Sequence, residues 1–277
     1  MYYLMLKFSF DWTHLISAYF LLASATVLIA KLIPDLRQLI RYGKVGLQSS
    51  TAEPRSYFAK LVALVASVKV PKTWFAHFYI VFALLQWVQL LLMPHAVVNS
   101  NYLVVWLLLT AQASRRLLES LFLTNWGSSS QMHISHYIVG LLFYVGISLL
   151  CYLGLSEGGS SHWEWLELRI VVAFVLFSFD QFQNHQHLAL LVKYSVPTFR
   201  LFKVVSCAHY LDEIIIYLLV TSESLTRGAK SSTCYAFVTA WTFAVVNLTV
   251  SSLETKAYYE IKFDDYDVEY AIVPYVI

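Results

Sequence analysis

The stretch ISHYIVGLLFYVGISLLCYLGL, from Ile134 to Leu155, decides the fold of this chain. It contains no Asp, Glu, Lys or Arg, and most of its side chains are aliphatic or aromatic. A helix rises about 1.5 Å per residue, so about 20 apolar residues cross the roughly 30 Å of hydrocarbon in a bilayer. This stretch therefore predicts a helix that spans a membrane.

The composition of the whole chain points to the same environment. Of its 277 residues, 58% are hydrophobic and 13% are charged, whereas about 25% of the residues in a soluble domain are charged. The formal net charge of +2 gives no reason to expect a nucleic-acid partner. The three cysteines lack the spacing of a disulfide framework or a zinc site, and we expect no bound metal. The composition favours a polytopic membrane protein.

On both sides of Ile134 to Leu155, six other stretches are long and apolar enough, or nearly so, to cross a bilayer. Counted along the chain, the fifth and sixth of the seven stretches are the weakest, because they are short and polar residues interrupt them. We expect an all-α fold, a seven-transmembrane-helix bundle in which residues 1–277 form a single integral membrane domain. The spans are expected at about 12–33, 74–93, 102–123, 134–155, 165–180, 204–221 and 234–253.

The distribution of Lys and Arg predicts the orientation of the bundle. The segment 34–73, between the first two spans, is rich in both residues, whereas the segment 94–101 has neither. Positively charged residues favour the cytosolic side of a membrane. We therefore expect the N-terminus in the lumen and the C-terminus in the cytosol.

Polar residues interrupt the third, fifth and sixth spans, and all of them are expected in the cytosolic half of the bundle. Ionisable groups at membrane depth are costly, so each one suggests a functional site. The third span carries Arg115, Arg116 and Glu119, the fifth ends with Asp180, Gln181, Asn184, His185 and His187, and the sixth contains His209, Tyr210, Asp212 and Glu213.

Each of these groups also has a purely structural interpretation. Arg115 and Arg116 are typical of a helix anchored at the interface on the positive side. Gln181 and His185 share a helix face at i, i+4 spacing, which fits ordinary packing as well as a ligand site. The chain has no GxGxxG and no GxxxxGK[ST] motif, so a bound nucleotide would have to be held by side chains.

Four blocks of the sequence resemble one known family. The segment KYSVPTFRLFKVVSCAHYLDEIIIYLL, Lys193 to Leu219, and the end LETKAYYEIKF with IVPYVI are similar to the C-terminal signature of the steroid 5-alpha-reductase family. VPKTWFAHFY, Val70 to Tyr79, and SRRLLESLF with QMHISHYIVGLLFY, within Ser114 to Tyr144, resemble the polyprenol reductase branch of that family, specifically its fungal members.

The resemblance implies a seven-helix enzyme of the endoplasmic reticulum membrane that uses NADPH. Its substrate is a long-chain polyprenoid, whose alpha-isoprene double bond is reduced on the way to the dolichol of protein N-glycosylation. The cofactor pocket that the family motifs imply contains Gln181, His185, Tyr194, His209 and Glu213. Arg115 and Arg116 are suited to nucleotide phosphates. Lys256 is either a further phosphate contact or an anchor near the membrane surface.

The chemistry of the reduction favours a conjugated aldehyde as the acceptor. Hydride added to the isolated alkene of a polyprenol leaves a carbanion that cannot delocalise, whereas hydride added to the beta carbon of a polyprenal gives an enolate that a hydrogen-bond donor stabilises. Steroid-reducing relatives bind the carbonyl with a glutamate and a tyrosine, and the aligned residues here are Phe78 and Ala113. We expect His77 to be the donor to the aldehyde oxygen, with Tyr137 and His136 behind it.

Some of these residues have another interpretation or differ from the family pattern. His77 is alternatively an interfacial histidine packed among aromatic residues. Phe199 replaces a family glycine, and Thr255 and Lys256 replace family histidines.

The sequence leaves other functions open. Another reductase of the same family, acting on a 3-oxo-steroid or a trans-2-enoyl thioester, is the nearest alternative. A transporter or assembly factor, or a lipid methyltransferase that uses S-adenosylmethionine, is a more distant one.

Overall fold

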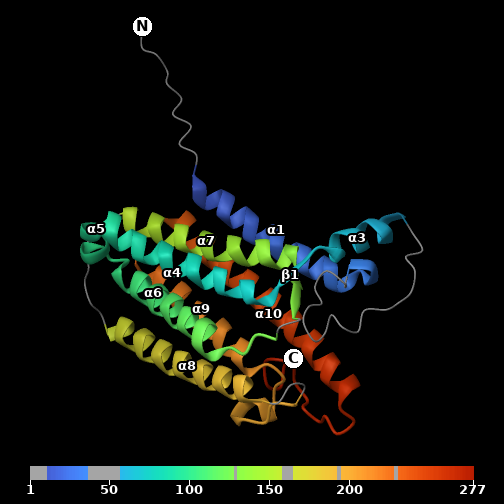
Figure 1. Ribbon diagram of the computed structural model, residues 1–277. Coiled ribbons are helices and arrows are strands. Elements are labelled where there is room, and N and C mark those ends of the chain that lie inside the picture. The colour runs from blue at the N-terminus through green and yellow to red at the C-terminus, as the bar shows by residue number, and fades with distance from the viewer. Residues whose placement is uncertain (1–10, 37–56, 128–129, 158–164, 192–194, 228–229) are drawn as a thin grey trace.

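The computed structural model describes residues 11–36, 57–127, 130–157, 165–191, 195–227 and 230–277. Within this part of the chain the fold is an elongated bundle of long helices (Figure 1). The prediction of an all-α protein is confirmed. The long helices are α1 (Trp12–Leu32), α4 (Phe75–Leu92), α6 (Leu103–Leu118), α7 (Ile134–Glu157), α8 (Trp165–Leu190), α9 (Ala208–Thr226) and α10 (Ser231–Lys262).

Short elements connect these helices. Before α4 the chain forms η1 (Pro34–Leu36), α3 (Tyr57–Ser67), β1 (Lys69–Pro71) and η3 (Lys72–Trp74). Further along lie α5 (Pro94–Asn99), the π-helix η4 (Glu119–Leu123), β2 (Gln131–His133) and η5 (Arg200–Lys203). The strands β1 and β2 pair antiparallel, with Val70 opposite Met132. Because α4 and α7 follow these strands, the pairing holds the first turns of both helices together.

Helix packing places α4 between α6 and α7, and α9 between α8 and α10, while α1 lies along α10. The contact between α1 and α10 includes an ion pair, in which Nζ of Lys31 is 2.5 Å from Oε1 of Glu254. Asp11 caps the start of α1, since its carboxylate accepts from the backbone N–H of Thr13 at 3.0 Å. The interior of the bundle is largely aromatic, with Phe20, Phe82 and other rings completely buried.

Four helices in the described part of the chain are long and apolar enough to cross a membrane: Trp12–Leu32, Lys72–Leu92, Ile134–Glu157 and Ser231–Lys262. Each of the seven expected spans contains a helix, but α6, α8 and α9 are not among these four. The expected count of seven membrane-crossing helices therefore stays a prediction.

Helix ends depart from the expected spans in three places. The fifth span was expected to end at Asp180, yet α8 continues to Leu190. The sixth was expected from Val204, yet α9 begins at Ala208. Before α9 the chain forms η5 and then turns, and it bonds to the C-terminal segment: Val205 forms an isolated bridge with Tyr270, and the N–H of Ser206 donates to the backbone oxygen of Tyr270 at 2.9 Å. The seventh is longer than expected at both ends.

The pair formed by α8 and α9 is held at one end by a buried ion-pair cluster. Arg227, just after α9, pairs with Glu167 near the start of α8 and with Glu223 in α9, at 2.6 Å from Nε to Oε1 in the second case. Both carboxylates are almost completely buried, so they need a cationic partner. The opposite end of α8 and α9 carries the polar residues singled out by the sequence.

Candidate active site

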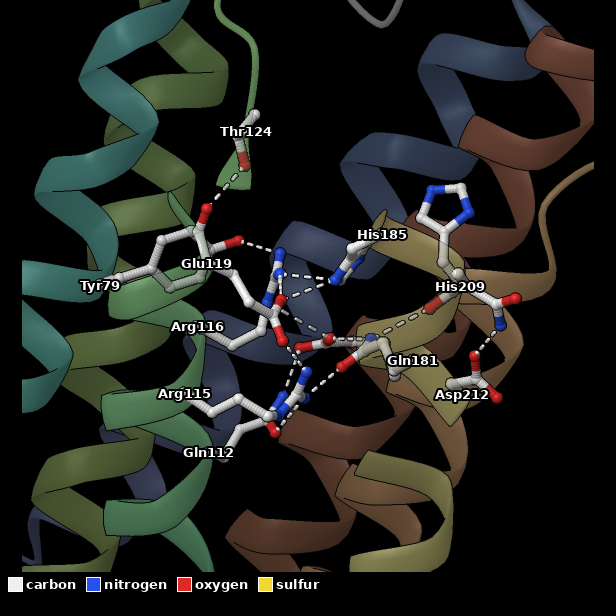
Figure 2. Close-up of polar contacts among 12 residues, drawn as sticks. Tyr79, Gln112, Arg115, Arg116, Glu119, Thr124, Gln181, His185, His209 and Asp212 are labelled. Atoms are coloured by element: carbon white, nitrogen blue, oxygen red, sulfur yellow. Dashed lines mark hydrogen bonds and ion pairs between the residues drawn. The ribbon is translucent and has the colours of Figure 1, made fainter. Parts of the chain in front are cut away.

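A polar cluster lies where the end of α6, the second half of α8 and the start of α9 meet (Figure 2). Arg115 and Arg116 are in the last turn of α6, and Glu119 follows them at i+4 and i+3. Side chains at these spacings meet on the surface of a helix. Glu119 also begins the π-helix, a wider turn that occurs frequently at functional sites.

Glu119 is the centre of this cluster, and only 3% of its surface is exposed. Its Oε1 accepts from Nη1 of Arg115, and its Oε2 lies 2.5 Å from Nη1 of Arg116. Nδ1 of His185 is 2.7 Å from the same Oε2. A buried carboxylate requires such partners, because an unpaired charge away from water is costly. Glu119 therefore fixes two guanidinium groups and one imidazole.

Gln181 joins three helices through one buried amide. Its Nε2 donates to the backbone oxygen of His209 at 3.0 Å and to Oε2 of Glu213 at 2.5 Å. Its Oε1 accepts from Nη2 of Arg115. Both N–H groups and the carbonyl of the amide are thus in use, and they set the spacing between α6, α8 and the start of α9.

Gln112 adds a further link between α6 and α9. Its Oε1 accepts from Nη2 of Arg115 at 2.7 Å, and its Nε2 donates to Oε1 of Glu213 at 3.3 Å. Like Gln181, it is almost completely buried.

Arg116 extends the cluster toward α4. Its Nη2 donates to Oη of Tyr79 at 2.6 Å, and its guanidinium carbon is 4.7 Å from the centre of the Tyr79 ring. Nη1 is 2.9 Å from Nδ1 of His185, and Nε is 3.9 Å from Oε2 of Glu213. Because Nδ1 carries either a proton or a lone pair, His185 donates to Glu119 in one tautomer and accepts from Arg116 in the other.

The donors of this cluster fit an anionic ligand such as the phosphates of a nucleotide. Nε of Arg115 and Nε of Arg116 are buried, and neither donates a hydrogen bond within the described part of the chain. A buried donor without an acceptor costs about 1–3 kcal/mol. A guanidinium group binds phosphate oxygens through two parallel N–H groups, so a bound phosphate would supply the acceptors that these atoms lack.

A second group of predicted residues lies at the first turns of α4 and α7. Nδ1 of His77 is 3.0 Å from the hydroxyl of Tyr137, and the ring of Trp74 lies 5.5 Å from His77 and 5.0 Å from Tyr137 between ring centres. His136 lies beside His133 of β2, with 6.2 Å between the rings. The β1–β2 pairing brings these residues together.

Aromatic rings connect the two groups. Phe78 lies 5.5 Å from Tyr137 and 6.3 Å from Tyr144, and Tyr144 lies 5.5 Å from Tyr79. Tyr79 in turn contacts Arg116. The polar cluster and the histidine group therefore border one aromatic region between α4 and α7.

Residues 130–277 match the family described as 3-oxo-5-alpha-steroid 4-dehydrogenase. The chain belongs to this family, the steroid 5-alpha-reductases. The chain is also similar to the polyprenal reductase of Saccharomyces cerevisiae, with 37% identity over 87% of this chain and 87% of the relative. The polyprenal reductase of Caenorhabditis elegans is 27% identical over 90% of this chain and 89% of the relative. That of Xenopus tropicalis is 27% identical over 87% of both chains.

The two residues expected at the positions of the steroid-binding glutamate and tyrosine, Phe78 and Ala113, are both apolar. Phe78 is 4% exposed and packs among aromatic rings, and Ala113 is completely buried. Neither side chain carries a hydrogen-bonding group, so a carbonyl bound by this chain needs another donor.

The structure brings most of the predicted cofactor residues into one cluster. The predicted residues that contribute side chains to it are Arg115, Arg116, Gln181, His185 and Glu213. His209 contributes its backbone oxygen, and its ring lies 5.7 Å from that of His185.

The two remaining predicted cofactor residues are not part of this cluster as described. Tyr194 lies outside the described residues. Lys256 pairs with Glu260 one turn further along α10. Among the described residues, Lys256 therefore makes no contact with the polar cluster, and its role in cofactor binding stays a prediction.

Sequence reasoning missed two residues that the cluster uses, Gln112 and Tyr79. Gln112 carried a signal, since it is a polar residue three positions before Arg115 within an apolar span. Tyr79 carried none, because it stands in the run TWFAHFY among other aromatic residues.

Proposed function

We propose that this protein is an NADPH-dependent polyprenal reductase, which reduces the alpha-isoprene double bond of a long-chain polyprenal to give dolichal for protein N-glycosylation. One observation carries the proposal: a buried guanidinium cluster suited to a dinucleotide borders an aromatic region that ends in a histidine and tyrosine pair. The names of the similar proteins support the choice of substrate.

The polar cluster is proposed to hold the cofactor. Arg115 and Arg116 bind phosphate oxygens, and the unused Nε groups supply part of that binding. Gln181, His185, His209 and Glu213 complete the pocket, with Tyr194 and Lys256 as further contacts. The bound dinucleotide supplies a hydride to the beta carbon of the aldehyde.

The histidine group is proposed to hold the substrate head. His77 donates a hydrogen bond to the aldehyde oxygen and so stabilises the negative charge that develops there. Tyr137 positions the imidazole through its 3.0 Å contact with Nδ1, and His136 stands behind it. The aromatic rings between α4 and α7 exclude water from the reacting carbons.

The proposed setting is the endoplasmic reticulum membrane, with residues 1–277 as a single domain of seven crossing helices, a lumenal N-terminus and a cytosolic C-terminus. The excess of Lys and Arg between the first two long helices supports this orientation. Protease treatment of sealed microsomes that carry a tag at either end tests it. Removal of an N-terminal tag from intact vesicles would contradict the orientation.

A substrate comparison tests the proposed activity. Purified protein in detergent should oxidise NADPH when a polyprenal is added and should not do so with the corresponding polyprenol. Reduction of polyprenol alone would contradict the mechanism. Activity only on a 3-oxo-steroid or a trans-2-enoyl thioester would move the chain to another branch of the family. No binding of NADPH would favour a non-catalytic membrane protein.

A lipid profile provides the corresponding test in cells. Cells that lack the protein should accumulate polyprenoids and lose dolichols. Unchanged dolichol levels would contradict the proposed function.

A further inference from the structure

The hydroxyl of Tyr79 is the point at which the polar cluster meets the aromatic region. Tyr79 lies in the first half of α4 and is 7% exposed. Nη2 of Arg116 donates to its oxygen at 2.6 Å, and the guanidinium carbon is 4.7 Å from the centre of its ring. On its other side the ring packs against Tyr144 at 5.5 Å between centres. Figure 2 shows Tyr79 directed from α4 toward Arg116.

The contact with Arg116 suits Tyr79 to act as an acid. A phenol oxygen that accepts a hydrogen bond still has its own proton to donate. When that proton leaves, the phenolate that forms lies beside a guanidinium group that stays protonated. A cation and a hydrogen bond at the oxygen both favour the ionised form, so they offset part of the cost that burial imposes on the phenolate.

The position of Tyr79 is as informative as its chemistry. It follows His77 by two residues along α4, and Phe78 between them contacts the rings of both Tyr137 and Tyr144. Arg116, which contacts Tyr79, also contacts His185 and Glu119. Tyr79 therefore stands between the residues proposed to hold the dinucleotide and those proposed to hold the aldehyde oxygen. A substrate held at one end by His77 and reduced by the dinucleotide at the other would have the carbon next to its carbonyl group in this interval.

We propose that Tyr79 is a catalytic residue that transfers its proton to the alpha carbon of the enal, with Arg116 stabilising the phenolate that remains. This inference rests on the proposed function, in which hydride from the reduced nicotinamide dinucleotide has become the new C–H bond at the beta carbon. The Tyr79 O–H bond breaks, and the electron pair of the enolate forms the C–H bond at the alpha carbon as the carbonyl is restored. A proton taken up from solution then restores the Tyr79 phenol, so the overall reaction consumes one proton and gives the saturated aldehyde and the oxidised dinucleotide.

The test compares Tyr79→Phe with the wild-type protein and with Tyr102→Phe, each purified at full length in detergent. Tyr102 is a matched control because it is also buried and its hydroxyl also makes one close contact, at 2.8 Å to Oγ of Ser224. That contact lies at the opposite end of α6 from Arg116. The substrate is a 20-carbon isoprenoid enal, and the measurements are kcat, KM, NADPH affinity by fluorescence and the midpoint of thermal unfolding.

General acids contribute roughly 10²–10⁴-fold to a rate, so kcat of Tyr79→Phe should fall at least about 100-fold. Its KM and NADPH affinity should stay within about twofold of the wild-type values. Tyr102→Phe should keep its kcat even if it unfolds at a lower temperature.

A partial reaction supplies a readout that does not depend on hydride transfer. With oxidised cofactor bound, the wild-type protein in D₂O should exchange the alpha hydrogens of the saturated aldehyde for deuterium faster than Tyr79→Phe does. Equal exchange by the two proteins, or full kcat in Tyr79→Phe, would overturn the role of Tyr79 alone. Loss of NADPH affinity in Tyr79→Phe would also overturn the catalytic role, because it would show that Tyr79 positions Arg116 for cofactor binding. A wild-type protein that neither binds NADPH nor reduces the enal would contradict the proposed function as well.

Discussion

A histidine that donates to a carbonyl oxygen must carry its proton on the nitrogen that faces the substrate. The hydroxyl of Tyr137 is 3.0 Å from Nδ1 of His77. When this hydroxyl donates, Nδ1 uses its lone pair and the ring proton resides on Nε2. In that tautomer, the contact between the two helix starts leaves Nε2–H of His77 as the group that could donate to a ligand.

Replacement of His77 tests this role at the scale of one residue. His77→Phe keeps a ring of similar size beside Trp74 but removes the donor, so turnover of a polyprenal should fall about 100-fold. NADPH affinity should stay within about twofold, because His77 is not among the contacts of the arginine cluster. His95→Phe, at an exposed histidine of α5, should leave both quantities unchanged. A large loss of NADPH affinity in His77→Phe would instead place His77 in the cofactor pocket.

The members of the candidate site that could be predicted are those whose residue type is costly inside a membrane. Arg115, Gln181 and Glu213 stand out in apolar spans, and the structure joins them. Tyr79 could not be predicted, because a tyrosine in an aromatic run has no distinguishing pattern. Its contact with Arg116 follows from the packing of α4 on α6, which the sequence of either helix alone does not specify.

At the scale of helices, one glycine sets how closely α7 approaches the residues before α6. A Cβ atom on Gly154 would lie 2.2 Å from Cε1 of Tyr102, whose ring is completely buried. Atoms cannot approach so closely, and a buried ring between helices has little room to move. The absence of a side chain at residue 154 is therefore a requirement of the packing.

Gly154→Ala should destabilise the protein by about 1–3 kcal/mol, the usual cost of an oversized group in a packed core. This cost exceeds the gain of roughly 1 kcal/mol that alanine gives over glycine in a helix. A lower midpoint of thermal unfolding in detergent checks it. Gly127→Ala is the control, because its Cβ would make only an ordinary contact at 3.6 Å. Equal midpoints for Gly154→Ala and the wild-type protein would show that α7 shifts freely.

The existence of the helices could be predicted more fully than their ends. Apolar runs indicate all seven long helices, but the polar residues from Asp180 onward predict that the fifth span ends there, which is too early. In the structure α8 continues, because Asn184 turns inward and its amide donates to the carboxylate of Asp212 at 2.7 Å. The delayed start of α9 depends on pairing with residues near 270. A contact across that distance in sequence leaves no local pattern.

At the scale of the whole molecule, the C-terminal segment closes the end of the bundle that carries the candidate site. The N–H of Cys207 donates to the backbone oxygen of Ala271 at 3.1 Å, and Ile272 is completely buried. The hydroxyl of Tyr266 is 2.7 Å from Oγ of Ser206. Burial raises the pKa of Tyr266 to about 12, so this hydroxyl keeps its proton at neutral pH. These contacts fix the chain just before α9 begins.

Removal of residues 269–277 should therefore weaken NADPH binding, although within the described part of the chain these residues make no contact with the polar cluster. Without the segment, the residues just before α9 lose their backbone hydrogen bonds to Tyr270 and Ala271, and Gln181 loses a fixed position for the backbone oxygen of His209 and the carboxylate of Glu213. Each hydrogen bond of this kind contributes about 1 kcal/mol or more, and 1.4 kcal/mol corresponds to tenfold in affinity. NADPH affinity should fall about tenfold or more, as measured by fluorescence titration of the purified protein. Tyr275→Ala, which changes an exposed side chain of the same segment, should bind NADPH normally. Wild-type affinity in the truncated protein would mean that α9 keeps its start without the C-terminal segment, and that the candidate site is complete within the helices alone.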